Sequence, residues 1–156
     1  MAAMTDTFEN KLIDFLLRAQ ALGITGASAA AGTGPVTTWV GLFTVAPTDS
    51  TAGTEVTGGS YARVSVTSAL ANWAGTQSAG STTASTGTSG TTSNNAAITF
   101  PAPSANWGVV VAAGIFDAVS AGTLLLYGAV TPNKTINTGD PAPSYAAAAL
   151  TFQIDN

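Results

Sequence analysis

The sequence contains no cysteine and no histidine, and only twelve of its 156 residues carry a charge. Without cysteine, the chain has no disulfide framework, no thiolate nucleophile and no thiolate ligand for a metal. Without histidine, it lacks the commonest general base and the commonest ligand of transition metals. A serine–histidine or cysteine–histidine catalytic unit is therefore excluded.

Basic side chains are equally scarce and lie far apart in the sequence, at Lys11, Arg18, Arg63 and Lys134. Four dispersed cations cannot neutralise many phosphates or form a polybasic membrane patch, so neither nucleic acid nor membrane is expected as a partner. No apolar run approaches the 18 residues of a membrane span. The N-terminus lacks the basic region of a signal peptide and carries Asp6 and Glu9 instead.

One third of the chain has no side chain that titrates. Between Arg63 and Asp117 there is no Asp, Glu, Lys, Arg, His, Cys or Tyr. Because active sites depend on titratable groups or activated nucleophiles, we expect no enzymatic activity and no cofactor. The acids Asp49, Asp117 and Asp140 fit turns, where Asp bonds its own backbone. The alternative is calcium bound by Asp49, Glu55 or Asp140, although no EF-hand spacing supports it.

Small residues dominate what is present, because Ala, Thr, Gly and Ser account for 85 of the 156 residues. The length suits a single domain covering residues 1–156. The net charge of −4 is too small for the signature of a disordered chain. A surface with so few charges is typical of proteins that are covered by neighbours, so we expect an oligomeric structural protein.

One segment, residues 6–20, is predicted to be an amphipathic helix. Asp6 stands three residues before Glu9, as in a capping box with Asp6 at the N-cap, and Gly23 and Gly26 follow the helix. Its apolar stripe has the 3.6-residue period and consists of Phe8, Leu12, Phe15 and Leu16. This stripe packs in the core or, alternatively, forms an interface with another subunit.

The remainder has the alternating pattern of β-strands separated by turn residues. The predicted strands are residues 37–46, 61–68, 96–100, 107–116, 123–130 and 149–154. The short link 117–122 joins two antiparallel neighbours. This spacing predicts a mainly β fold, an antiparallel sandwich or jelly-roll-like domain with one N-terminal helix.

Two segments of low complexity, residues 23–34 and 75–95, interrupt this pattern. They consist largely of Ala, Gly, Thr and Ser and cannot bury much apolar surface, so flexible loops are expected. The alternative is an extended arm that becomes ordered against neighbouring subunits. Trp39, Trp73 and Trp107 are expected in the core, with a sugar-stacking platform as the alternative.

Several short motifs follow one another along the chain, at residues 9–14, 40–44, 47–49, 55–63, 107–108, 114–118, 122–129 and 134–140. Together they span most of the chain apart from residues 75–95. In these motifs and in their order the sequence resembles a family of small structural proteins of tailed bacteriophages, whose members are commonly labelled tail-fibre proteins.

The resemblance implies a virion component, and a small β-rich chain of this kind also suits a cement protein that decorates the capsid as trimers. We therefore expect a non-enzymatic capsid decoration protein whose partners are further copies of itself, as a homotrimer, and the major capsid protein or another virion protein. A tail-fibre or receptor-binding subunit is the alternative, and a hydrolase of the host envelope is a third possibility.

Overall fold

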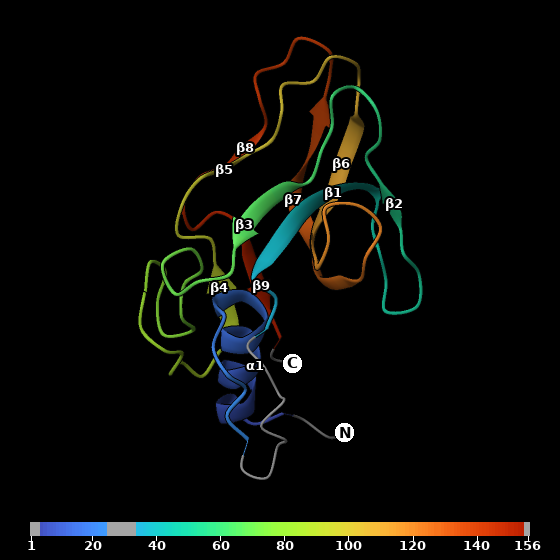
Figure 1. Ribbon diagram of the computed structural model, residues 1–156. Helices are drawn as coiled ribbons and strands as arrows, with labels where there is room; N and C mark the ends of the chain where they lie inside the picture. The colour runs from blue at the N-terminus through green and yellow to red at the C-terminus, as the bar shows by residue number, and fades with distance from the viewer. Residues whose placement is uncertain (1–3, 25–33, 155–156) are drawn as a thin grey trace. The chain divides into compact units, whose positions relative to one another are not determined.

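The computed structural model describes residues 4–24 and 34–154. It contains one α-helix and a series of mostly short strands (Figure 1). In chain order these are α1 (Asp6–Arg18), β1 (Thr37–Val45), β2 (Thr54–Glu55), β3 (Val64–Thr67), β4 (Thr91–Ser93), β5 (Ile98–Thr99), β6 (Gly108–Phe116), β7 (Leu124–Ile136), β8 (Ser144–Tyr145) and β9 (Thr151–Gln153). The prediction of a mainly β fold with one N-terminal helix and antiparallel sheets is confirmed, and the sandwich arrangement stays a prediction.

The chain divides into two compact units, neither of which is continuous in sequence. Unit 1 comprises the described residues of Met1–Thr37, Thr67–Ala97 and Ala146–Asn156. Unit 2 comprises Thr38–Val66 and Ile98–Tyr145. The chain therefore passes from one unit to the other four times. That residues 1–156 form a single domain stays a prediction.

Unit 2 holds the five-stranded sheet, apart from the end residues Thr37 and Thr67. The strand order is β2-β1-β6-β7, and β3 pairs with β1. Strands β6 and β7 are antiparallel neighbours, which confirms the link predicted at 117–122. A second, two-stranded sheet in the same unit pairs β5 with β8.

Residues 40–43 of β1 and 112–116 of β6 are buried on both faces of the sheet, and none of them is polar. Phe43, Ala112 and Phe116 form a cluster on one face, and the rings of Phe43 and Phe116 stack with centroids 5.8 Å apart. Gly114 makes room for this stack, because a Cβ there would lie 2.9 Å from the Phe43 ring and 2.6 Å from Leu124 Cδ1. The stacked rings of Phe43 and Phe116 therefore fit on this face because residue 114 has no side chain.

Unit 1 contains α1, the two-stranded sheet of β4 and β9, and residues 75–95, here called the Ser/Thr-rich segment. The N-cap of α1 is Thr5, whose hydroxyl accepts from the backbone N–H of Phe8; the predicted cap, Asp6, is already the first helical residue. The helix ends at Arg18 with Ala19 in the left-handed region at φ 55°, ahead of the glycines expected to stop it. Most of the predicted loop 23–34 lies outside the described residues.

Candidate functional site

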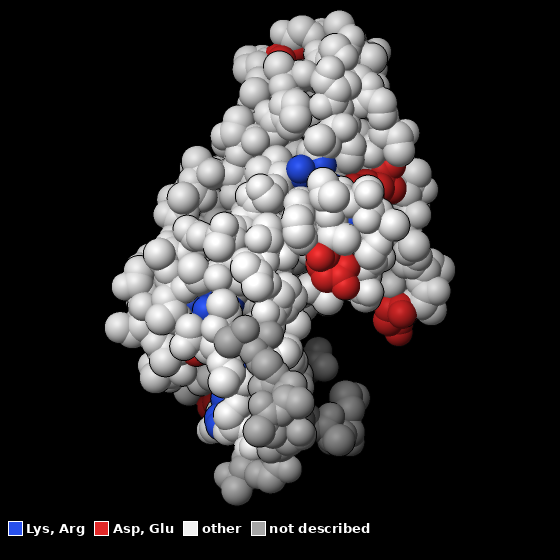
Figure 2. All heavy atoms as spheres, viewed as in Figure 1, with Lys and Arg blue, Asp and Glu red and all other residues white. Residues whose placement is uncertain are grey.

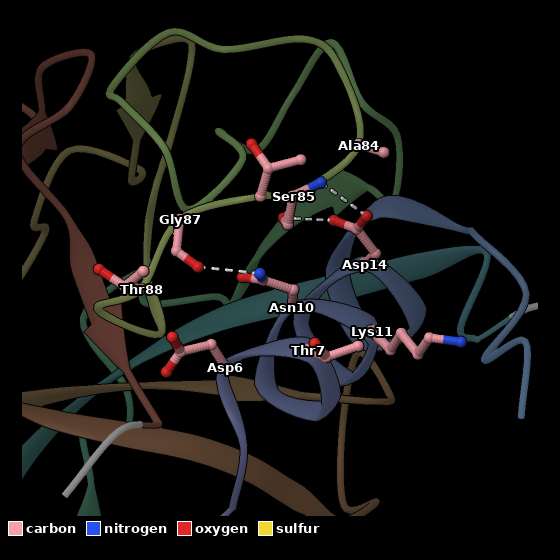
Figure 3. Close-up of a pocket in the computed structure, with 10 residues that line it drawn as sticks. Asp6, Thr7, Asn10, Lys11, Asp14, Ala84, Ser85, Gly87 and Thr88 are labelled. Atoms are coloured by element: carbon pink, nitrogen blue, oxygen red, sulfur yellow. Dashed lines mark hydrogen bonds between the residues drawn. The ribbon is translucent and has the colours of Figure 1, made fainter.

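A groove of unit 1 lies between α1 and residues 84–88 and has a volume of about 480 Å³ (Figure 3). The helix contributes one wall and residues 84–88 the other. Its lining residues are Asp6, Thr7, Asn10, Lys11, Asp14, Ala84, Ser85, Thr86, Gly87 and Thr88. The groove is polar and has no aromatic side chain in its walls.

The two walls are bonded to each other across the groove. Asn10 donates from its side-chain amide to the carbonyl of Gly87 over 2.9 Å. Asp14 accepts from the backbone N–H of Ser85 at 2.9 Å and from its hydroxyl at 2.6 Å. Lys11 is directed away from this wall in Figure 3 and donates to the carbonyl of Gly23. The side chains of Asn10, Lys11 and Asp14 are therefore already hydrogen-bonded to other residues of the same chain.

Arg18 forms the centre that holds the Ser/Thr-rich segment. Its side chain is fully buried and makes an ion pair of 2.5 Å with Asp14, one helical turn earlier. A guanidinium carries five N–H donors, and in this structure the three nitrogens of Arg18 together have five oxygen acceptors. The acceptors are Trp73 O (3.0 Å), Asp14 Oδ1 (2.5 Å), Ser85 Oγ (3.1 Å), Ser81 O (3.5 Å) and Thr83 O (2.6 Å).

Residues 75–90 contain no helix or strand, as expected of a loop, and hydrogen bonds join them to the helix of their own chain. That the segment 75–95 is flexible, or becomes ordered against neighbouring subunits, stays a prediction. The small side chains of this segment let its backbone carbonyls approach the guanidinium directly. Further along, Asn94 is buried and binds the C-terminal segment, donating to Ala146 O at 2.8 Å and accepting from Leu150 N at 2.9 Å.

Unit 2 has its own arginine centre, built on Arg63. Its guanidinium forms a bidentate ion pair with Glu55, with distances of 2.8 and 2.7 Å. It also donates to the carbonyls of Ala118 and Ala121, both at 2.8 Å, in the loop between β6 and β7. The same guanidinium lies 3.3 Å from the centroid of the Phe116 ring, a cation–π contact. Arg63 therefore fixes this loop to the aromatic face of the sheet.

Tyr61 extends the Arg63 centre into the core. Its hydroxyl donates to Glu55 at 2.8 Å and accepts from the backbone N–H of Leu42 at 2.9 Å. Burial raises the pKa of Tyr61 well above its ordinary value, and the nearby Glu55 carboxylate raises it further, against the lowering effect of the Leu42 hydrogen bond. The phenol therefore stays protonated and serves as a donor, not as a base.

A smaller pocket of about 230 Å³ lies in unit 2, beside the second half of β7. Most of its lining is apolar, including Phe100, Val110 and Ile136, and the polar contributors are Lys134, Ser144 and Tyr145. Burial raises the pKa of Tyr145 to about 12. The pocket has no carboxylate, so it offers no acid–base pair.

The apolar stripe of the helix, predicted to lie in the core or in a subunit interface, is only partly buried. Phe8, Leu12, Phe15 and Leu16 are all half-buried. The fully buried face of α1 instead carries Ile13 and Leu17 together with the charged side chains Glu9, Asp14 and Arg18. The 3.6-residue period identified the apolar positions of the helix. It did not identify its most buried face, where Asp14 and Arg18 bind each other and Ser85.

Of the acids considered as calcium ligands, Glu55 is paired with Arg63 and Asp140 accepts the backbone N–H of Asn137 in a turn, while Asp49 is exposed in a bend. Asp117, predicted only to serve a turn, accepts the backbone N–H of Thr123. Within residues 4–24 and 34–154, no group of three or more acids is close enough to hold a metal ion.

The tryptophans belong mainly to the interior. Trp73 and Trp107 are buried, which excludes their rings as a sugar-stacking platform, while Trp39 is half-buried. Trp107 donates from its indole N–H to Gly59 O at 2.8 Å and packs edge-on against Tyr61. No helix among the described residues has the length and apolar character needed to cross a membrane.

Comparison with known proteins gives one match. The family model described as Podophage GP4 fiber I protein gp80 matches residues 3–153. No curated protein matches the chain.

Proposed function

Because the chain belongs to the family described as Podophage GP4 fiber I protein gp80, a family of phage virion structural proteins, we propose that it is a subunit of a virion fibre. The match over residues 3–153 carries this proposal, since it includes both units and is not confined to one motif. The family description favours the fibre over the capsid decoration protein expected from the sequence.

The surface supports a role in contacts between proteins. Figure 2 shows a face on which charged side chains are few and scattered among uncharged ones. Glu9, Asp14 and Arg18 are buried, and Arg63 is paired with Glu55, so the surface is even poorer in charge than the composition indicates. Contacts between such surfaces avoid the desolvation of ions. The partners in this proposal are further copies of the chain and other virion proteins.

The number of copies per virion distinguishes the fibre from capsid decoration. We expect quantitative mass spectrometry of purified virions to give a few to tens of copies, and electron microscopy of particles labelled through this protein to place the label on the tail. Hundreds of copies with label distributed over the head would overturn the fibre proposal and favour a capsid decoration protein.

We further propose that the protein is not an enzyme. Of the two cavities described above, the groove of unit 1 has the carboxylates of Asp6 and Asp14, of which Asp14 is paired with Arg18, and the pocket of unit 2 has no carboxylate. Incubation with host envelope glycans is expected to release no products. Hydrolysis that is lost in Asp117→Asn or Asp140→Asn, but retained in the exposed control Asp49→Asn, would refute this part of the proposal.

A further inference from the structure

The pocket of about 230 Å³ in unit 2 has an apolar base. This base is formed by residues that are only 2–3% exposed, namely Leu42, Phe100, Val110 and Ile136. An apolar cavity of about 150 Å³ lined by Leu, Ile and Phe is large enough to bind benzene. The pocket of unit 2 can therefore hold one aromatic ring or a branched alkyl group of similar size.

The pocket lies where the pairing of β6 with β7 is interrupted. Val110 pairs with Lys134 and Ala112 pairs with Ala129, so one residue of β6 faces four residues of β7, 130–133. Val110, Val130 and Lys134 all line the pocket beside this interruption. Bulges are common next to functional sites, where they change the direction of a side chain. The irregular pairing thus places an apolar space and a lysine side by side.

Three polar side chains line the same pocket, and none of them is an acid. Lys134 and Ser144 are exposed and Tyr145 is half-buried, so these side chains lie at the rim. The Ser144 hydroxyl shares a hydrogen bond with Thr99 over 3.0 Å. The hydroxyl of Tyr145 has no hydrogen-bond partner among the residues that the structure describes. Because burial raises the pKa of Tyr145 to about 12, this phenol is protonated and can donate to a ligand.

The ammonium group of Lys134 is equally free to bind a ligand. The other basic side chains bind within the chain: Arg18 and Arg63 form ion pairs, and Lys11 donates to a backbone carbonyl. Asp140 lines an adjoining pocket together with Lys134, but its carboxylate accepts a backbone N–H of its own turn. Within residues 4–24 and 34–154, Lys134 forms no ion pair and its ammonium group donates no hydrogen bond.

We propose that this pocket binds a small organic anion with a compact apolar group, such as an aryl or branched-alkyl carboxylate. The apolar group lies on the buried base, and the carboxylate accepts hydrogen bonds from Lys134 and Tyr145 at the rim. Charge selects this class of ligand, since the pocket offers a cation and no carboxylate. All of these residues belong to unit 2, and the site goes beyond the proposed function and does not depend on it.

Isothermal titration calorimetry with phenylacetate tests the class of ligand. Phenylacetate is expected to bind to one site per chain with a dissociation constant of about 1 mM or below. Phenylethanol keeps the ring without the charge, and acetate keeps the charge without the ring, so each should bind more weakly by about tenfold or more. Phenylacetate that does not bind saturably, or that binds no more tightly than either analogue, overturns the proposal.

Substitutions at the rim test the donors. Lys134→Met keeps the aliphatic stem, removes the charge and should weaken the binding of phenylacetate by about tenfold, and Tyr145→Phe should weaken it by about threefold or more. The matched control Lys11→Met removes an ammonium group from unit 1 and should leave the affinity unchanged. Equal effects of Lys134→Met and Lys11→Met, or none for Lys134→Met, overturn the proposal.

Hydrogen exchange of the unsubstituted protein locates the site without relying on any variant. Phenylacetate is expected to slow exchange in β5, at the start of β6 and in residues 130–145, and to leave α1 and residues 75–95 unchanged. Slower exchange confined to unit 1, or saturable binding that leaves unit 2 unchanged, shows that the anion binds elsewhere and overturns the proposal.

Discussion

The two units each contain a buried arginine, but the surroundings of these arginines differ. Arg18 in unit 1 is enclosed by oxygens, three of them backbone carbonyls of residues 73, 81 and 83. Arg63 in unit 2 lies on the ring of Phe116 and holds a loop against a sheet that is already packed. A segment with little apolar surface can therefore be ordered by one cation that collects its carbonyls, whereas an apolar sheet needs its cation only at the periphery.

The largest effect expected from this comparison is that of Arg18→Met. The change leaves Asp14 buried without its cation and frees the carbonyls of the Ser/Thr-rich segment, which destabilises unit 1 by about 3–5 kcal/mol. Hydrogen exchange measured by mass spectrometry reports each unit separately, and protection is expected to fall across residues 75–95. The matched variant Arg63→Met should cost less, because Glu55 retains 23% exposure and access to water. An equal or larger loss for Arg63→Met would contradict the comparison.

The next effect is a loss of stability at alkaline pH that is confined to unit 2. All three tyrosines lie in unit 2, and burial raises the pKa of Tyr145 to about 12 and that of Tyr61 further. The unfolded chain loses these protons near pH 10 and the folded chain does not, so stability is complete below pH 10 and falls as the pH rises toward 12.

Hydrogen exchange at increasing pH, corrected for its intrinsic pH dependence, measures this loss in each unit. Tyr145→Phe removes one of the two groups and should reduce the loss of stability per pH unit above pH 10 by about half. If unit 1 loses protection at the same pH as unit 2, the assignment of alkaline sensitivity to the buried phenols is wrong.

Added volume should distinguish packed from open positions within unit 2. Gly114→Val forces its side chain into Phe43 and Leu124 and destabilises the unit by about 1–3 kcal/mol. Gly128→Val, at a position with no neighbour within 4 Å, leaves the stability of the dilute monomer unchanged or slightly raised. Denaturant unfolding of the two variants provides the measurement, and a smaller cost for Gly114→Val than for Gly128→Val would contradict the packing described here.

The smallest expected effect is at the N-cap of α1. The hydrogen bond from Phe8 N to the Thr5 hydroxyl is long, at 3.4 Å, so Thr5→Ala should destabilise the helix by about 0.5 kcal/mol, the lower end of the range for caps. Exchange should increase in the first turn of α1 only, and unit 2 provides the internal control. A loss of more than about 2 kcal/mol would mean that the cap supports more than the helix end.

Local patterns predicted the elements well where side chains of one type recur. The helix and the strands at 37–46 and 107–116 follow from periodicity, and the structure differs from them by at most two residues at each end. The helix cap was displaced by one residue because Thr5 and Asp6 are both good capping residues. Strand β7 runs six residues past its predicted end at Val130, since an edge strand tolerates Pro132.

The arginine centres could not be predicted in the same way. Apart from Asp14, the acceptors of Arg18 lie 55 to 67 residues away in sequence, and most of them are backbone carbonyls, which every residue has. The sequence offered one indication of these ion pairs, since the chain has just two arginines and each has an acid nearby. Asp14 lies four residues before Arg18, and Glu55 lies eight residues before Arg63. The burial of Trp73 and Trp107 followed from their apolar neighbours, as expected.

The discontinuity of both units affects how this chain is made. Helix α1 leaves the ribosome early, but the carbonyls that surround Arg18 and the strand β9 that pairs with β4 are synthesised much later. Unit 2 in turn lacks β8 until Tyr145 has been added. A nascent chain stalled before residue 144 would therefore expose incomplete versions of both units.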